Sequence, residues 1–216
     1  ELHMLFGEIE LARLRLQGLI DASPQDPVGY IAMSRLSLRA GRDAEAEQVI
    51  RAGVAAAPDN LAAGLLLAQI LERRADFAGA IAEYRRLFEL NRDSVIVANN
   101  LSSLIADHQD DDPEALEFAS RVALRLRGYD IPHFKDTYGW IRFLQGNYAE
   151  ALISLREAAE GLPDNALVRY HLGETLAALG DTAEARQHLQ AALAIDPQFP
   201  AAEQARARLA TLTDAP

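Results

Sequence analysis

The stretch ALVRYHLGETLAALGDTAEARQHLQAALAIDPQF, residues 166–199, decides the fold because its landmarks recur along the chain. It carries a small residue before a glycine turn, an alanine after the turn, and a proline twelve residues beyond that alanine. The alanine recurs at spacings of 34, 34, 35, 36 and 34 residues, as Ala12, Ala46, Ala80, Ala115, Ala151 and Ala185. A period of this length is typical of stacked supersecondary units rather than of one globular core.

Two more columns keep the same period. A small residue precedes most of these alanines, at Ser34, Ala68, Ser102, Gly139 and Gly173. Prolines follow four of the alanines and are missing from the two middle units; they are Pro24, Pro58, Pro163 and Pro197. Small residues let two helices pack closely, and a proline prevents a helix from continuing. Each unit is therefore predicted to hold two antiparallel helices, A and then B, and the chain to be an all-α solenoid.

These landmarks divide the chain into one half repeat, five repeats and an end helix. The divisions are 1–4 as a cloning remnant, 5–24 as a half repeat with a B helix only, 27–60, 61–94, 95–131, 132–165 and 166–199 as repeats, and 200–212 as a capping helix. The half repeat has a helix from about Phe6 to Ile20 without its A partner. We expect one of its sides to be exposed, which favours a homodimer through this half repeat.

The same division predicts one helix cap and the outer face of the end helix. Asp43 is expected to cap the B helix of the first complete repeat. The end helix is expected to carry Arg206 and Arg208 on its outer side, because a terminal repeat needs a polar outer face.

The third repeat is irregular at both ends of its B helix. The acidic run 107–112 precedes Pro113, which is predicted to open that helix with Asp112 as its N-cap. The helix is predicted to end near Arg127, before a connector over 128–131 that is longer than its counterparts. The run lacks the alternating acids, central glycine and final glutamate of a calcium-binding EF-hand loop, so a solvated loop is favoured over a calcium site.

Composition excludes several classes of function. The net charge of −11 argues against nucleic acid and anionic membranes as partners, because their phosphates need a basic face. The absence of cysteine removes disulfides, thiolate metal sites and cysteine nucleophiles. No apolar run is long enough to span a membrane, and the compartment, whether periplasm, cell envelope or cytoplasm, stays open. The basic residues, 20 arginines and the single Lys135, indicate a bacterial source with a GC-rich genome.

The repeat columns resemble those of the tetratricopeptide repeat (TPR) family over nearly the whole chain. Two units carry most of the pattern, one with Leu172, Gly173, Gly180, Ala185, Ala192 and Pro197, the other with Gly139, Gly146, Tyr148, Ala151, Ala158 and Pro163. The resemblance implies a right-handed α-solenoid of about 12 helices that binds a partner segment in a concave groove. A finer resemblance, over 99–101 and 136–140, is to bacterial TPR lipoproteins of exosortase and exopolysaccharide systems.

The family also implies which positions line the groove, namely the inner residues of the A helices. The predicted partner-binding residues are Ile31, Arg35, Leu38, Arg39, Leu65, Gln69, Arg73, Asn99, Asn100, Ser103, Asp136, Trp140, Phe143, Tyr170 and Glu174, with Glu72, Asp107 and Ala177 in the same row. The carboxylate clamp of chaperone-binding TPRs uses an early lysine and asparagine. Here those positions hold Ile31 and Arg35, so that clamp is not reproduced.

Two alternatives stay open for the most informative of these residues. Trp140, the only tryptophan, is either an exposed binding anchor or a residue packed under the 128–133 connector with Phe134 and Phe143. Arg35, Arg39 and Arg73 form either a cradle for a carboxylate or phosphate, or solvated surface ion pairs with Glu72 or other acids.

The sequence therefore predicts a non-catalytic scaffold that binds a protein or peptide partner. No phosphate-binding loop, nucleophile elbow, dinucleotide fingerprint or His-Glu-x-x-His motif is present, so no enzyme, cofactor or metal is predicted. Two alternatives remain: a repeat component of an exopolysaccharide or envelope assembly system, and the regulatory TPR region of an enzyme such as a glycosyltransferase. All three hypotheses are compatible with a segment of a larger bacterial protein.

Overall fold

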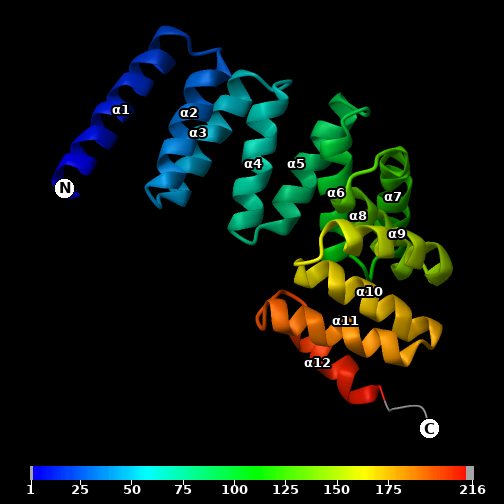
Figure 1. The fold of residues 1–216 in the computed structure, drawn as a ribbon. Coiled ribbons are helices and arrows are strands. Elements are labelled where there is room, and N and C mark those ends of the chain that lie inside the picture. Colours follow the sequence, from blue (N-terminus) through cyan, green and yellow to red (C-terminus); the bar gives the residue numbers. More distant parts are fainter. Residues whose placement is uncertain (1, 213–216) are drawn as a thin grey trace. The chain divides into compact units, whose positions relative to one another are not determined.

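The computed structural model describes residues 2–212, and side chains from residue 8 onward. Within this range the backbone forms twelve α-helices and one 3₁₀ helix, with no strand (Figure 1). The chain divides into two compact units, residues 1–97 and 98–216. We call them the N-terminal and C-terminal units.

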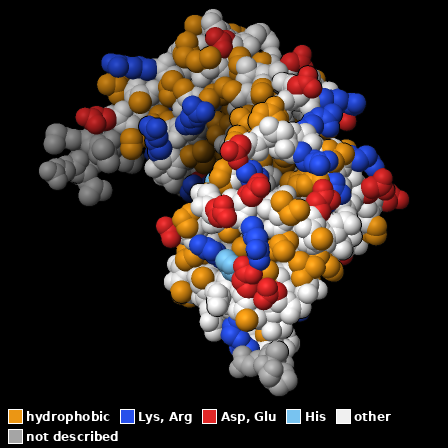
Figure 2. Space-filling model, turned by 45° about the vertical axis from the view of Figure 1, so that its right-hand side comes forward, with side chains coloured by type: hydrophobic (Ala, Val, Ile, Leu, Met, Phe, Trp, Pro, Cys, Tyr) orange, Lys and Arg blue, Asp and Glu red, His pale blue; other side chains and the backbone are white. Residues whose placement is uncertain are grey.

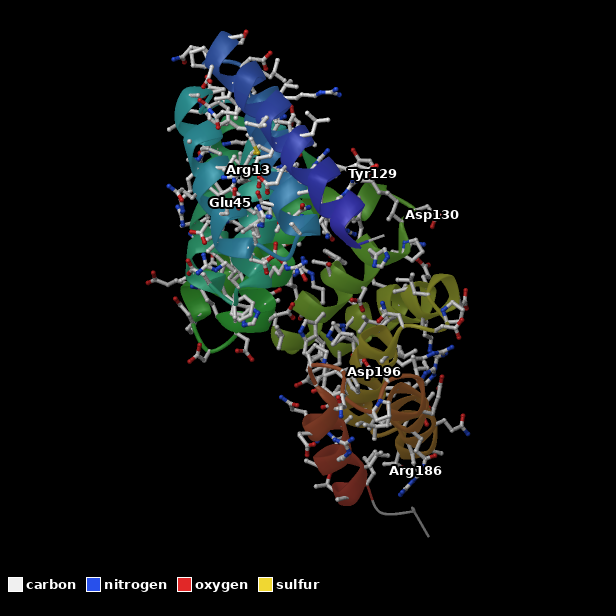
Figure 3. All side chains as sticks on the ribbon, turned by 90° about the vertical axis from the view of Figure 1, so that its left-hand side faces the viewer. Arg13, Glu45, Tyr129, Asp130, Arg186 and Asp196 are labelled. Carbon is white, nitrogen blue, oxygen red and sulfur yellow. The ribbon has the colours of Figure 1, made fainter. Side chains whose placement is uncertain are left out.

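The N-terminal unit holds the first five helices. They are α1 (Leu2–Ala22), α2 (Pro27–Arg39), α3 (Asp43–Ala56), α4 (Leu61–Arg73) and α5 (Phe77–Leu90). The helix α6 (Val95–His108) begins in this unit and continues into the next. Helices α2 and α4 are A helices that pack against the B helices α3 and α5, and α1 packs against α2. Arg13 of α1 also forms an ion pair of 3.1 Å with Glu45 of α3, which anchors the first helix (Figure 3).

The C-terminal unit holds the remaining elements. They are α7 (Pro113–Ala123), the 3₁₀ helix η1 (Leu124–Gly128), α8 (Pro132–Leu144), α9 (Tyr148–Gly161), α10 (Ala166–Leu179), α11 (Thr182–Ile195) and α12 (Ala202–Thr211). Helix α8 pairs with α9 and α10 pairs with α11, while α12 closes against α11. The A helices of this unit are thus α6, α8 and α10, followed by α12.

The small-residue and alanine columns form the contacts inside each helix pair. A Cβ atom on Gly139 would lie 2.7 Å from Leu155 Cγ, and one on Gly173 would lie 2.8 Å from Leu189 Cγ. Ser34 is completely buried and donates its hydroxyl to the Ala46 carbonyl at 2.8 Å. The helices are therefore closer here than larger side chains would allow.

One of the two expected helix caps is confirmed and the other needs correction. Asp112 caps α7 as predicted, accepting hydrogen bonds from the backbone of Glu114 at 2.9 Å and Ala115 at 3.2 Å. The expected cap of α3 is wrong by one residue, because Asp43 is the first helical residue and Arg42 holds the cap position. Gly41, with φ of 70°, completes the preceding turn and so sets where α3 can begin.

The helix ends also differ in detail. The first helix is longer than the predicted Phe6–Ile20, since it spans Leu2–Ala22. The B helix of the irregular repeat ends at Ala123 rather than near Arg127, and continues as the 3₁₀ turn η1. This tighter turn buries Leu126 while Arg125 and Arg127 stay exposed.

Candidate partner-binding faces

In the N-terminal unit, the predicted groove residues form an apolar row edged by exposed polar groups. Ile31, Leu38 and Leu65 are half-buried, while Arg35, Arg39, Gln69 and Arg73 are exposed. Apolar atoms beside exposed guanidinium groups are suited to a partner that carries both an apolar side chain and an acidic group.

The arginines of this face differ in their pairing. Arg35 and Arg39 lie one helical turn apart on α2 and make no ion pair with the described residues. Arg73 pairs with Asp43 at 3.0 Å, and its side chain remains 59% exposed. Glu72 instead accepts a hydrogen bond of 2.6 Å from the Tyr84 hydroxyl. The alternative of a surface ion pair with Glu72 or another acid is therefore confirmed for Arg73, whose partner is Asp43 of the preceding B helix and not Glu72.

In the C-terminal unit, Trp140 lies within a stack of rings on α8 and α10. It stacks on Phe143 at 4.7 Å and on His171 at 4.1 Å between ring centroids, with interplanar angles of 8° and 13°. Tyr170 lies 5.9 Å away in a tilted arrangement. We call Trp140, Phe143, Tyr170 and His171 the aromatic stack. Trp140 and Phe143 are only half-buried, so part of each ring is open to solvent.

The packing alternative for Trp140 is thus correct in one partner and wrong in the other. Phe143 contacts Trp140, whereas Phe134 packs edge-on against Tyr129 of the connector, at 6.0 Å and 82°. Phe134 and Trp140 are six residues apart on α8, and this spacing places their side chains on different faces of the helix.

One carboxylate is bonded to the aromatic stack, and a second lies on α6. Asp136 of α8 accepts a hydrogen bond of 2.9 Å from His171 Nδ1 of α10. Asp107 of α6 accepts a long hydrogen bond of 3.4 Å from the Ser103 hydroxyl. Although Asp107 is exposed overall, desolvation of its carboxyl group raises its pKa, and repulsion from Asp136 adds to this shift while His171 and His108 oppose it.

Glu174 is occupied by an internal ion pair. It is only 5% exposed, and its two carboxylate oxygens accept hydrogen bonds of 2.7 to 3.0 Å from Arg208 of α12. Arg208, which we expected on the outer side of the end helix, is therefore turned toward α10. Beside this pair lies a hollow of about 340 Å³ lined by Tyr170, Glu174, Gln204, Ala207, Arg208 and Thr211.

Tyr170 lines the same hollow as this ion pair. Burial and the nearby Glu174 carboxylate raise the pKa of the Tyr170 hydroxyl to about 12, although Arg208 acts in the opposite direction.

The amide residues of α6 complete the C-terminal face. Asn99 donates to the Asn100 side chain at 3.3 Å, and both residues are half-buried. The side-chain oxygen of Asn99 is buried without a hydrogen-bond partner in the described part of the chain. It is the kind of acceptor that a partner backbone N–H would satisfy.

Sequence reasoning missed His171 and Arg208 as members of this face, yet a signal for both was present. His171 follows its partner Asp136 by 35 residues, and Arg208 follows Glu174 by 34. Each separation equals one repeat, so polar residues of opposite character at that spacing indicate a pair between neighbouring A helices.

The described residues contain no cluster of three histidine, aspartate or glutamate side chains that could hold a metal ion. Over the same range, none of the helices combines the length and apolarity needed to cross a membrane.

Figure 2 shows acidic and basic side chains interspersed with hydrophobic ones over the surface in view. Leu11, Leu14 and Leu19 of α1 are exposed, and the homodimer through this helix stays a prediction.

Antiparallel helix pairs that recur with this period define an α-helical repeat protein. The family model of the tetratricopeptide repeat matches residues 3–70 and 142–209, more than half of the chain. The chain belongs to the TPR family, and the solenoid fold predicted from its columns is confirmed.

One curated relative extends far beyond this chain. A TPR repeat-containing protein of Pseudomonas aeruginosa is 29% identical over 169 residues, which are 78% of this chain and 28% of that protein. The chain therefore spans little more than a quarter of that relative's length. The resemblance to exosortase-associated lipoproteins stays a prediction, because neither this relative nor the family model refers to such a system.

Solved structures share the fold at low sequence identity. A TPR protein from Parabacteroides merdae matches with a TM-score of 0.68 at 14% identity, covering 96% of this chain and 85% of its own. YrrB, a TPR protein with an unusual peptide-binding site, matches with a TM-score of 0.66 at 16% identity, covering 89% of this chain and 97% of its own. The type IV pilus biogenesis factor PilW matches with a TM-score of 0.66 at 14% identity, covering 84% of this chain and 84% of its own. At these identities the likeness concerns the fold alone.

Proposed function

We propose that this chain is a non-catalytic scaffold that binds a partner protein segment along the A-helix faces, as part of a larger bacterial protein. The observation that carries the proposal is the aromatic stack of α8 and α10, in which Trp140 and Phe143 stay half-buried at positions that the family resemblance implies for the groove. The length of the Pseudomonas aeruginosa relative supports the larger protein, and the peptide-binding site named for YrrB supports the class of ligand.

Binding energy at such a face comes from a few anchors rather than from the whole contact area. Aromatic and arginine side chains that lose water on binding are the usual hot spots, and truncation of one typically costs ~2 kcal/mol or more. In the C-terminal unit the open parts of Trp140 and Phe143 would supply the apolar anchor. In the N-terminal unit Arg35 and Arg39 would pair with acidic groups of the partner.

The test compares partner capture by variants of each face. Trp140→Ala and Arg39→Glu are used as baits in extracts of the source organism, and partners are quantified by mass spectrometry. Ile195→Ala, at the exposed end of α11, and Arg15→Glu, on exposed α1, are the matched controls. We expect each groove variant to lose at least tenfold of a partner that both controls retain. Equal capture by all four variants would contradict binding by the A-helix faces.

A further inference from the structure

We propose that the irregular repeat holds a second binding site, a pocket that takes one apolar side chain of a partner protein with an acidic residue beside it. The pocket lies in the C-terminal unit, between residues 124–131 and the helices α8 and α9, and encloses about 210 Å³. We call it the connector pocket. The inference goes beyond the proposed function, because this pocket is separate from the aromatic stack.

The connector pocket and the aromatic stack use different faces of α8. Phe134 and Tyr138 line the pocket, and their separation of four residues places them on one side of the helix. Trp140 and Phe143, which stack on each other, lie on another side, because the six residues from Phe134 to Trp140 make about one and two-thirds turns. A ligand in the pocket would therefore leave the groove face open to its own partner.

The pocket owes one of its walls to an insertion between two helices. Four residues join α3 to α4, α5 to α6 and α9 to α10, whereas eight residues, 124–131, join α7 to α8. Leu124, Tyr129 and Ile131 of this longer segment are exposed, and Tyr129 can be found in Figure 3. The three shorter connectors expose no large hydrophobic side chain. Because insertions in repeat proteins often form the binding face, these exposed apolar groups indicate a surface that a partner covers.

The pocket has apolar walls and the size of a single side chain. Leu126 and Phe134 line it and are buried, whereas Tyr129 and Ile153 line it and stay 45% and 65% exposed. Tyr129 packs edge-on against Phe134. Small-molecule sites usually enclose about 300–1,000 Å³, so this smaller volume suits one anchor side chain of a protein partner. Such an anchor would remove the apolar parts of Tyr129 and Ile153 from water.

The carboxylates that line the pocket are already engaged. Glu157 forms an ion pair of 2.8 Å with Lys135. Glu150 accepts a hydrogen bond from the Tyr138 hydroxyl and lies 3.5 Å from the Arg142 guanidinium. A basic group of a partner would therefore have to compete with cations that these carboxylates already hold.

Arg127 is the lining cation that stays available. The other one, Lys135, is bonded to Asp130 as well as to Glu157. Arg127 is exposed and forms no ion pair with the residues that the structure describes. Its Cζ atom lies 5.8 Å from the centre of the Tyr138 ring, a cation–π contact that holds the guanidinium at the pocket. An aspartate or glutamate beside the apolar anchor would form charge-assisted hydrogen bonds with this guanidinium.

Selection from a displayed library of random dodecapeptides tests the ligand chemistry. The library is first depleted on the immobilised Ile153→Asp variant, which removes peptides that bind elsewhere, and is then selected on the whole wild-type chain. Enriched peptides are sequenced, synthesised and titrated by calorimetry. We expect them to share a large apolar residue next to aspartate or glutamate, and to bind less tightly as salt is added.

Variants locate the two parts of the contact. Arg127→Gln is expected to weaken binding of the enriched peptides about tenfold, a typical size for one charge-assisted contact, and Ile153→Asp to abolish it. The same changes at exposed positions elsewhere, Arg15→Gln and Ile195→Asp, should leave affinity unchanged. Replacing the acidic residue of the peptide by glutamine should cause the same loss as Arg127→Gln. Because Arg127 and Ile153 are exposed, we expect the variants to fold, and circular dichroism checks this.

The outcomes separate this inference from the proposed function. No enrichment after depletion, or peptides whose affinity survives Ile153→Asp, would overturn the connector pocket. A loss with Ile153→Asp but none with Arg127→Gln, or enrichment of lysine or arginine beside the apolar residue, would overturn the acidic ligand. None of these results bears on the groove, whose failure shows instead as partner capture that is indifferent to Trp140→Ala.

Discussion

The two units are built from the same helix pair but present different chemistry. The N-terminal unit has 14 acidic and 11 basic residues, and its A-helix face exposes Arg35 and Arg39. The C-terminal unit has 18 acidic and 10 basic residues. Its face carries the aromatic stack, to which the Asp136 carboxylate is bonded through His171. The small-residue columns specify how helices pack and leave the face positions free. The shared scaffold therefore fixes where a partner can lie, whereas the variable residues select its chemistry.

The largest effect on stability should come from a larger side chain in the small-residue column, because helix pairs in both units pack closely there. Gly173→Leu would force a side chain into Leu189 and the Ala185 carbonyl, and we expect it to lower the free energy of unfolding by about 3 kcal/mol. Gly18→Leu on exposed α1, where an added Cβ meets nothing, is the control and should stabilise by up to about 1 kcal/mol, because glycine is a poor helix former. Urea unfolding followed by circular dichroism measures both. A tolerated Gly173→Leu would contradict the close-packing role of the column.

Two of the inter-helix ion pairs, Arg208–Glu174 and Arg73–Asp43, should differ in strength. Arg208→Met leaves the Glu174 carboxylate buried and unpaired, and should cost about 2 kcal/mol after allowance for the 44% exposure of Arg208. Arg73→Met breaks the more exposed pair with Asp43 and should cost less than about 0.5 kcal/mol. Thermal unfolding of the two variants side by side gives the difference. Equal losses would mean that burial does not distinguish the two pairs.

One turn of the N-terminal unit lacks the glycine of its counterparts. Ala75 has φ of 58°, whereas Gly41, Gly146 and Gly180 occupy the equivalent left-handed positions. Ala75→Gly should therefore stabilise the chain by about 1 kcal/mol. Ala78→Gly, in the helical first turn of α5, is the opposite control and should destabilise by about the same amount. A loss of stability in both variants would contradict strain at Ala75.

The smallest effect concerns the unpaired charge of the C-terminal face. The raised pKa of Asp107 means that the folded state binds its proton more tightly than the unfolded state, so the ionised group opposes folding above that pKa. Asp107→Asn should then be slightly more stable than wild type at pH 7, and the difference should vanish below the ordinary aspartate pKa, near pH 3. Chemical unfolding at both pH values checks this. A less stable variant at pH 7 would indicate that Asp107 stabilises the fold.

Contacts within one helix could be predicted from the sequence, but pairings between helices could not. Trp140 and Phe143 lie three residues apart on α8, a spacing at which side chains on a helix are neighbours, and their rings do stack. The role of His171 was missed because its partners, Asp136 and Trp140, lie on another helix. Asp43 was assigned as a cap because the length of a turn is uncertain by one residue when only its glycine is known.

The sequence by itself determined the repeat period, the helix pairs and the columns of close packing, because these depend on local propensity and on volume at fixed spacing. The tertiary structure decided that Arg208 pairs with Glu174 rather than with solvent, and that His171 lies between Asp136 and Trp140. Such contacts depend on how neighbouring helices are rotated against each other. That rotation results from the packing of whole helix faces, which no single stretch of residues encodes.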